Sequence, residues 1–485
     1  MFFLGLDIGT TRMKCGIYGE DGEAVYFDSC DYGEKKWTDE TYIDVETIYD
    51  KALEMLGRAY RHTPFDSIAI SSLGESFVLL DADDRVLFLP MLYTDPRGER
   101  EAAAFEKNAE RIFAISGVYP QSMYSAYKLL WIKNNRPEIY KRAQKLFLVG
   151  EYVGYRLTGV RAIDHSLAAR TGIYDVRRLE FSAELCDLLG IDKDLFSPSV
   201  RSGDIIGELL PSVKEYIGAV ADVKLIAGGH DQVSAAIGAG AVSDGICSDG
   251  MGTVECLAVP YRNAFESCEM GVYGYPNVPH GVLGLYCTYL LNLSCGSLVD
   301  WWLTKAFSDV SKENIYIEAE KDFSDEPTGL LVLPYFGGAS TPYQNINAKG
   351  SILNLKLSDS ASRVYQGIFE GLAMEMKLNL DLVAKHGVSP KMIVATGGCS
   401  ASRRALQIKS DIFGLPVYPL KIKEAGICGC AMLGASALLS EDIGSVAKRF
   451  VKLGEPLEPR AEIHQKYKAE YEKYKELYLT LKKFY

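Results

Sequence analysis

The stretch LGLDIGTTRMKCGIY, residues 4 to 18, decides the fold of this chain. An apolar run ends in an aspartate, a glycine and two threonines, and a second, partly alternating apolar run follows. Apolar runs bounded by turn residues in this way predict two β-strands joined by a short flexible loop. Asp7 then lies at the end of the first strand, where a carboxylate is available for chemistry.

The length and composition predict a large globular protein with two domains. At 485 residues the chain exceeds the size at which one hydrophobic core keeps growing. Its 48% hydrophobic and 24% charged residues are typical of globular chains and unlike disordered ones. The formal net charge of −12 argues against a general affinity for nucleic acid, because phosphate backbones attract basic surfaces.

Cysteine usage and the absence of targeting signals predict a cytoplasmic protein. The eleven cysteines follow no disulfide or zinc spacing, which is typical of reduced thiols. The start MFFLGLD has no basic segment and does not resemble a secretory signal. Residues 281–299 are uncharged, but they contain Asn292, glycines and hydroxyl residues without flanking basic anchors. We therefore expect a buried strand and helix there and no membrane association.

Strand-like and helical patterns alternate along the chain, which predicts an α/β fold. The opening pattern recurs in GICSDGMGTVECLAV, residues 245–259, again as strand, acidic residue, Gly/Thr loop and strand. A further strand, KMIVATGG at 391–398, ends in paired glycines and leads into a helix. The two halves are therefore predicted to be built alike, with domains at 1–245 and 246–485.

The Gly-rich loops at these strand ends suit phosphate oxygens, because they offer unpaired backbone N–H groups. None has the GxxxxGK[ST] or GxGxxG spacing of common nucleotide loops. In the first loop Thr10 and Thr11 offer hydroxyls, Lys14 a cation, and Asp7 a carboxylate of the kind magnesium prefers. One such loop is most often an ordinary hairpin turn, but recurrence in both halves indicates a nucleotide and metal site between duplicated domains.

Asp231 is the candidate base for a phosphoryl-transfer reaction. It lies in IAGGHDQVSAA, after an expected strand and at the start of an expected helix, where paired glycines leave room for a small substrate. A carboxylate at this place can accept the proton of an acceptor hydroxyl. The structural alternative is a helix N-cap, which is the usual role of a lone aspartate at such a position.

A second polar cluster follows strands of the same half. It comprises Glu75 in SSLGESF and Asp95 with Arg97 in YTDPRGE. Carboxylates and a guanidinium together can bind several sugar hydroxyls. The alternative is a surface ion pair beside a turn, which the three residues alone favour.

Taken together, these motifs resemble the FGGY family of carbohydrate kinases, and the resemblance covers nearly the whole chain. GLDIGTTRMK and DGMGTVE are similar to the two phosphate loops of the family, YTDPR to its substrate motif and GGHDQ to its catalytic loop. TGGCSASRRALQIKSDIFGLPV is similar to the adenosine segment. The resemblance implies two duplicated ribonuclease H-like domains, the actin-like ATPase fold, with an interdomain cleft.

Carried over by position, the resemblance implies a role for each matching residue. Asp231 becomes the general base and Asp7 the carboxylate near Mg2+, while Glu75, Asp95, Arg97 and Gln232 bind the substrate. The implied ATP-binding residues are Gly9, Thr10, Thr11, Lys14, Gly252, Thr253, Gly397, Gly398 and Ser402. The expected partners are ATP and a small sugar or polyol, and a homodimer is compatible with the resemblance.

Several positions depart from the family pattern. Gly74 stands where glycerol kinases carry an arginine, and Glu75 stands where xylulose kinases carry a histidine. Ala339 and Ser340 replace a Glu-Arg pair of the xylulose kinases, and Ala405 replaces a common tryptophan. These departures leave the ATP positions intact and remove the residues that would identify the sugar.

The sequence therefore predicts ATP-dependent phosphorylation of a small sugar or polyol, with a ketopentose such as xylulose as the leading acceptor. A kinase for glycerol or erythritol is the first alternative. The second is a nucleotide-switched binding protein on the same fold, against which Asp231 and the Asp95/Arg97 cluster argue.

Overall fold

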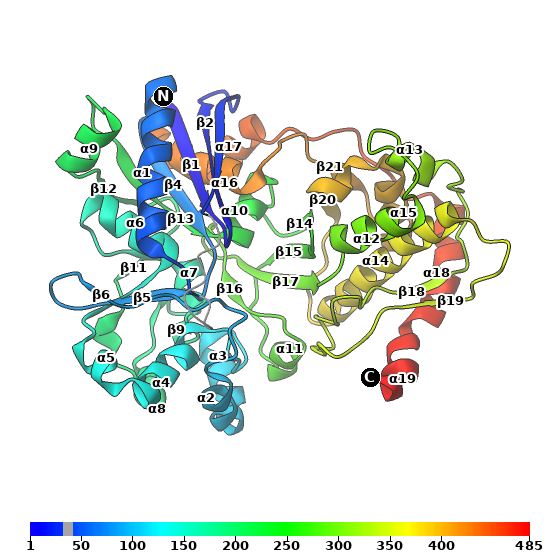
Figure 1. Ribbon diagram of the computed structural model, residues 1–485, viewed down its shortest axis with the longest axis horizontal. Helices are drawn as coiled ribbons and strands as arrows, with labels where there is room; N and C mark the ends of the chain where they lie inside the picture. The colour runs from blue at the N-terminus through cyan, green and yellow to red at the C-terminus, as the bar shows by residue number, and fades with distance from the viewer. Residues whose placement is uncertain (33–41) are drawn as a thin grey trace.

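The computed structural model describes residues 1–32 and 42–485, which form two lobes that each contain a six-stranded sheet (Figure 1). The first sheet has the strand order β12-β13-β4-β1-β2-β3. Its strands are β1 (Phe2–Ile8), β2 (Arg12–Gly19), β3 (Ala24–Asp31), β4 (Ser67–Ser72), β12 (Ile205–Glu208) and β13 (Lys224–His230). Strands β1, β4 and β13 run parallel, whereas β2 and β3 form an antiparallel meander at one edge.

The second sheet has the order β16-β17-β15-β14-β20-β21. Its strands are β14 (Ile246–Met251), β15 (Glu255–Tyr261), β16 (Val278–Pro279), β17 (Tyr286–Asn292), β20 (Met392–Thr396) and β21 (Val417–Pro419). Strands β14, β20 and β21 run parallel, whereas β15 and β17 are antiparallel. Strand by strand, β1, β2, β3, β4 and β13 correspond to β14, β15, β17, β20 and β21, which confirms the predicted duplication of an α/β unit.

Helices cover the two sheets and fill the space between them. Those before the second sheet are α1 (Val45–His62), α2 (Glu99–Ala104), α3 (Ala109–Ser116), α4 (Ser125–Asn135), α5 (Pro137–Arg142), α6 (Val149–Thr158), α7 (His165–Ala169), α8 (Ala183–Leu189), α9 (Pro211–Ile217) and α10 (Asp231–Gly238). Those after it are α11 (Cys268–Val272), α12 (Gly296–Ala306), α13 (Ile315–Glu320), α14 (Ala361–Ala384), α15 (Arg403–Phe413), α16 (Ala425–Leu439), α17 (Ile443–Phe450), α18 (Ala461–Lys475) and α19 (Leu477–Leu481).

Short strand pairs and one turn complete the fold. They are β5 (Phe77–Leu80) between β6 (Val86–Phe88) and β7 (Lys145–Leu148), β8 (Ile163–Asp164) with β11 (Ser199–Val200), β9 (Tyr174–Asp175) with β10 (Glu180–Phe181), and β18 (Leu331–Leu333) with β19 (Ser351–Leu353). A 3-10 turn, η3, covers Gly398–Ala401. The uncharged segment 281–299 contains β17 and the start of α12, as predicted, and no helix among the described residues is long and apolar enough to cross a membrane.

Helices α16 and α17 come late in the chain but pack against the first sheet, beside β1 and β2 (Figure 1). The approach of α16 is close because glycines line it. A Cβ added at Gly5 would lie 2.1 Å from the carbonyl oxygen of Ile427, and one added at Gly429 would lie 2.0 Å from that of Ser234. The second half of the chain therefore contributes a helix to the core of the first lobe.

Candidate active site

The carboxyl ends of β1, β4 and β13 place the first-lobe candidates at one edge of the sheet. Asp7 on β1 is in register with Ser71 on β4, and Ser71 is in register with Gly229 on β13. The Ser71 hydroxyl donates a hydrogen bond of 2.8 Å to Asp7 Oδ1. Because β13 ends at His230, Asp231 begins α10 at this same edge, where ligands of α/β sheets bind.

One carboxylate oxygen of Asp231 is buried and has no hydrogen-bond partner among the described residues. This oxygen is Oδ1, and His230 Nε2 lies 3.3 Å away from it. Burial, together with the negative charges of Asp7 and Glu75, raises the pKa of Asp231 to about 7. The side chain still has 38% of its surface accessible to solvent. The N-cap of α10 is His230 and not Asp231, so the capping alternative is wrong.

Asp7 lies beside a cation that has its own partner. Burial raises the pKa of Asp7, and the Ser71 hydroxyl and the charge of Lys14 oppose that shift. Lys14 Nζ contacts Glu424 Oε2 at 2.9 Å, and both side chains keep about a third of their surface accessible. Glu424 precedes α16, so this ion pair joins the first loop to the helix that returns from the second half.

The loop between β1 and β2 presents its predicted ligands to solvent. Thr10 and Thr11 are exposed and Gly9 is half-buried. The N–H of Gly9 donates to the carbonyl oxygen of Arg12 at 3.0 Å, which closes the turn. The hydroxyl groups of both threonines are thus available at the same sheet edge as Asp7.

The predicted substrate cluster is divided between two ion pairs. The Arg97 side chain donates two hydrogen bonds to the Asp95 carboxylate, of 2.9 Å and 2.6 Å, and its backbone N–H donates a third of 2.9 Å, in a half-buried turn. Although burial opposes ionisation, the hydrogen bonds and charge of Arg97 hold the pKa of Asp95 below its usual value. Glu75 is buried and is paired instead with Arg170. Gln232 is half-buried on α10 next to Asp231.

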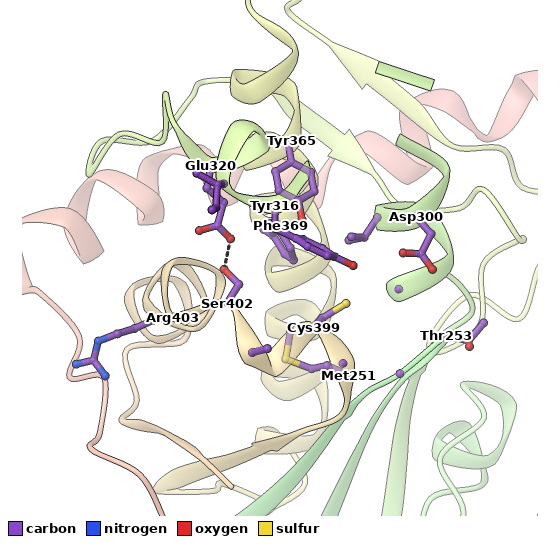
Figure 2. Close-up of a pocket in the computed structure, with 16 residues that line it drawn as sticks. Met251, Thr253, Asp300, Tyr316, Glu320, Tyr365, Phe369, Cys399, Ser402 and Arg403 are labelled. Atoms are coloured by element: carbon purple, nitrogen blue, oxygen red, sulfur yellow. Dashed lines mark hydrogen bonds between the residues drawn. The ribbon is translucent and has the colours of Figure 1, made fainter. Parts of the chain in front are cut away.

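The second lobe contains a cavity of about 670 Å³ (Figure 2). Four of the predicted ATP-binding residues line it: Gly252, Thr253, Gly398 and Ser402. Tyr316, Tyr365 and Phe369 supply aromatic walls, and Asp300, Glu320 and Arg403 supply charged groups. A cavity of this size and mixed lining suits a nucleoside.

Gly397 precedes the cavity-lining residue Gly398 and contacts the end of β14. Its φ of +88° is unfavourable for a residue with a side chain. A Cβ at this position would also lie 2.6 Å from the carbonyl oxygen of Met251. The two Gly-rich segments of the second lobe therefore touch at Gly397, and this contact requires a glycine.

Ser402 is held by two hydrogen bonds at the rim of the cavity. Its hydroxyl accepts from the N–H of Ala405 at 3.1 Å, which caps α15, and donates to Glu320 Oε1 at 2.6 Å (Figure 2). The hydroxyl is therefore engaged with Glu320 from α13, a partner that local sequence pattern does not predict.

Asp249, the counterpart of Asp7 in the second lobe, is fully buried. Lys409 on α15 donates to both Asp249 and Glu255, and all three side chains are at most 2% exposed. Burial, with the neighbouring charge of Asp249, raises the pKa of Glu255 to about 7, against the opposing charge of Lys409. The cluster joins α15 to β14 and β15, the two strands on either side of the second Gly/Thr loop.

The structure thus brings together Asp7, Asp231, Glu75 and Gln232 in the first lobe, and most second-lobe candidates around one cavity. Sequence reasoning missed Arg170, Lys128 and Tyr289 in the first site. Arg170 lies in the stretch DHSLAARTGIYD, residues 164–175, where its pairing with a residue 95 positions earlier has no local signal. Lys128 is buried and donates to the carbonyl oxygen of Asp95 at 2.7 Å.

Comparison with known proteins identifies relatives along the whole chain. The N-terminal domain of the FGGY family of carbohydrate kinases matches residues 2–238, and the C-terminal domain of that family matches residues 251–438. The chain is 28% identical to the xylulose kinase of Bacillus subtilis (strain 168) over 492 aligned residues. That alignment covers 99% of this chain and 97% of the relative.

Solved structures share the fold. The ligand-bound xylulose kinase from Lactobacillus acidophilus has a TM-score of 0.91 at 24% identity, and the gluconate kinase from the same organism has a TM-score of 0.90 at 24% identity. Both alignments cover 99% of this chain and 98% of the other. The same two-lobed architecture therefore occurs in kinases named for different sugars, and the fold leaves the acceptor open.

Proposed function

We propose that this chain, which belongs to the FGGY family of carbohydrate kinases, transfers the γ-phosphoryl group of ATP to a hydroxyl of a small neutral sugar, with xylulose as the leading acceptor. The observation that carries the proposal is the Asp231 carboxylate at the sheet edge, with its buried, unpartnered Oδ1 and with Asp7 and Glu75 near enough for their charges to raise its pKa. The name of the Bacillus relative supports xylulose as the first acceptor to test.

In this proposal Asp231 acts as the general base. Its carboxylate accepts the proton of the acceptor hydroxyl while that oxygen attacks the phosphorus atom in line with the leaving ADP oxygen. A pKa of about 7 suits this task, because the carboxylate is then partly ionised at neutral pH and can still hold the transferred proton. Gln232, on the same turn of α10, would orient the acceptor.

The nucleotide would span both lobes. The exposed hydroxyls of Thr10 and Thr11 and the backbone of the second loop at Gly252 and Thr253 would bind its phosphates. The 670 Å³ cavity would hold the adenosine group. Lys14 is paired with Glu424, and the remaining N–H donors of its ammonium group would be available to the phosphates.

A magnesium ion fits the first-lobe edge. No group of three or more His, Cys, Asp or Glu side chains among the described residues is arranged to hold a metal by itself. Magnesium bound together with nucleotide is usually held by one or two carboxylates, phosphate oxygens and water, and Asp7 provides such a carboxylate. When bound there, the ion would neutralise phosphate charge.

The experiment that tests this function measures ADP release with ATP and magnesium across ketopentoses, pentitols, glycerol, erythritol, hexuloses and gluconate. We expect one neutral sugar to stimulate release in the wild-type protein. In Asp231→Asn the stimulated rate of ADP release should fall by about 10²-fold to 10⁴-fold. In the control variant Asp222→Asn, which changes an exposed ion pair with Lys214, the stimulated rate should not fall. Nucleotide binding without stimulation by any acceptor would reject the kinase assignment for these compounds and favour a nucleotide-switched protein.

A cytoplasmic location and a homodimer remain predictions. The eleven cysteines are free in the structure, as is typical of proteins in a reducing compartment.

A further inference from the structure

Arg170 is a buried cation that the mechanism above does not use. It follows α7 and has 5% of its side chain accessible. Its Nε donates to Glu75 Oε1 at 2.6 Å, and its Nη2 donates to the same oxygen. Within residues 1–32 and 42–485 no hydrogen bond reaches the other oxygen of Glu75, Oε2, so this oxygen remains available as an acceptor.

The backbone of Glu75 needs support to hold this position. Its φ is +49°, in the left-handed region that residues with side chains rarely adopt. The Ser125 hydroxyl donates to the Glu75 carbonyl oxygen at 2.7 Å, and Arg170 holds the carboxylate end. Two contacts from different elements therefore fix the direction of one side chain, as a binding group requires.

Gly74 makes room for Arg170. A Cβ added at Gly74 would lie 3.0 Å from Arg170 Cγ, 3.2 Å from Arg170 Cβ and 3.1 Å from His230 Cδ2. Any side chain at position 74 would therefore push against the guanidinium stem on one side and the catalytic loop on the other. This is a steric reason for a glycine immediately before Glu75.

Aromatic rings enclose Arg170 and connect it to the base. Its Cζ lies 5.1 Å from the ring centre of Tyr124 and 5.8 Å from that of Tyr289. Tyr289 comes from β17 in the second lobe, and its hydroxyl lies 3.1 Å from His230 Nδ1. Arg170 thus contacts Glu75 directly and contacts the residue that joins the second lobe to the Asp231 loop.

We propose that Arg170 is a positioning residue for the acceptor: it holds one oxygen of Glu75 so that the other accepts a hydrogen bond from a substrate hydroxyl, and Gly74 is required for this arrangement. The inference rests on the proposed function and deepens it. An acceptor that donates a hydroxyl hydrogen to Glu75 Oε2 is a neutral sugar or polyol, whereas a sugar carboxylate at that place would be repelled.

The test compares Arg170→Lys, Arg170→Gln and Gly74→Ala with wild type. Gly57→Ala on α1 is the matched control, because α1 contributes no residue to the site and the added Cβ would meet the flexible Arg61 side chain at 3.3 Å. The measurements are acceptor KM, kcat, the pH profile of kcat/KM, and ADP affinity by calorimetry. Most of the proposed nucleotide cavity lies in the second lobe, away from the substituted residues. An unchanged ADP affinity therefore shows that a variant has kept a folded nucleotide site.

We expect acceptor KM to rise about tenfold in Arg170→Lys and Gly74→Ala, and about a hundredfold in Arg170→Gln, as hydrogen bonds to charged groups are lost. ADP affinity should stay within about twofold of wild type. The acid limb of the pH profile should move to higher pH in Arg170→Gln and stay in place in Arg170→Lys, because only the glutamine removes a positive charge near Asp231. The titratable and charged groups around Asp231 are Asp7, Glu75, Tyr93, Arg170, His230, Cys256 and Tyr289.

Two results would overturn the inference, and they have different consequences for the proposed function. If wild type turns over an acceptor and all three variants keep its KM and acid limb, Arg170 does not position the acceptor although the proposed function stands. If wild type turns over no acceptor, the proposed function and this inference both fail. Should Arg170→Gln lose ADP binding through misfolding, Arg170→Lys and Gly74→Ala decide the question.

Discussion

Asp7 and Asp249 occupy corresponding strands of the two lobes, β1 and β14, and each precedes a Gly/Thr loop. Asp7 lies at an open sheet edge beside Asp231, and the cation near it, Lys14, is half-buried and held by Glu424. Asp249 is fully buried, and Lys409 binds it from within the core. A repeated pattern thus supplies a partly accessible carboxylate in one lobe and a buried ion cluster in the other.

The largest expected effect concerns the two lysines. Lys409→Met leaves two carboxylates buried without a cation, and losing one partner of a buried ion cluster typically costs about 3–5 kcal/mol of unfolding free energy. Lys14→Met breaks a partly exposed pair, which contributes at most about 1 kcal/mol. Urea unfolding of both variants measures the difference. Equal losses of stability would contradict the contrast between the lobes.

The second effect concerns the two aspartates in catalysis. Asp7→Asn should lower kcat by on the order of 10²-fold and raise the magnesium concentration needed, because a carboxylate near the phosphates is lost. Asp249→Asn should leave kcat within about threefold, since Asp249 contacts Lys409 and not the site. Steady-state assays with a magnesium titration separate the two. A comparable loss in both variants would show that the second-lobe aspartate also serves the reaction.

The third effect is the pH dependence of turnover. The pKa of Asp231 is raised to about 7, and only its ionised form accepts a proton. We therefore expect kcat/KM to fall about tenfold per pH unit below that value and to level off above it. Rates at saturating ATP and magnesium between pH 5.5 and 8.5 give the profile. A flat profile over this range would exclude Asp231 as a base with this pKa.

The smallest effect concerns Ser402 in the second lobe. Ser402→Ala removes the cap of α15 and the bond to Glu320, so we expect a loss of about 1 kcal/mol in stability and a KM for ATP raised a few-fold. Ser182→Ala removes the corresponding cap of α8, a helix of the first lobe that does not line the cavity, and should lower stability similarly without changing that KM. If both variants change the KM for ATP equally, the effect of Ser402 is structural only.

Much of the fold follows from local sequence pattern. The strand-loop-strand segments expected at 4–18 and 245–259 are β1 with β2 and β14 with β15, and the strand expected at 391–398 is β20. The Lys/Glu/Tyr-rich tail from 461 is helical with its tyrosines buried. Such elements are predictable because side-chain periodicity and turn residues act over a few positions. The tail helix is interrupted at Glu476, between α18 and α19, which its uniform composition did not reveal.

The sequence by itself determined where candidate groups stand along the chain: Asp7 at the end of the first strand, Asp231 at the start of α10, and glycines where loops must turn. Only the tertiary structure decided their partners. Glu75 pairs with Arg170, Asp249 with Lys409 160 residues away, and Lys14 with Glu424 410 residues away. The physical reason is that an ion pair depends on which elements pack together and on how much water they exclude, and neither is encoded in the few residues around each charge.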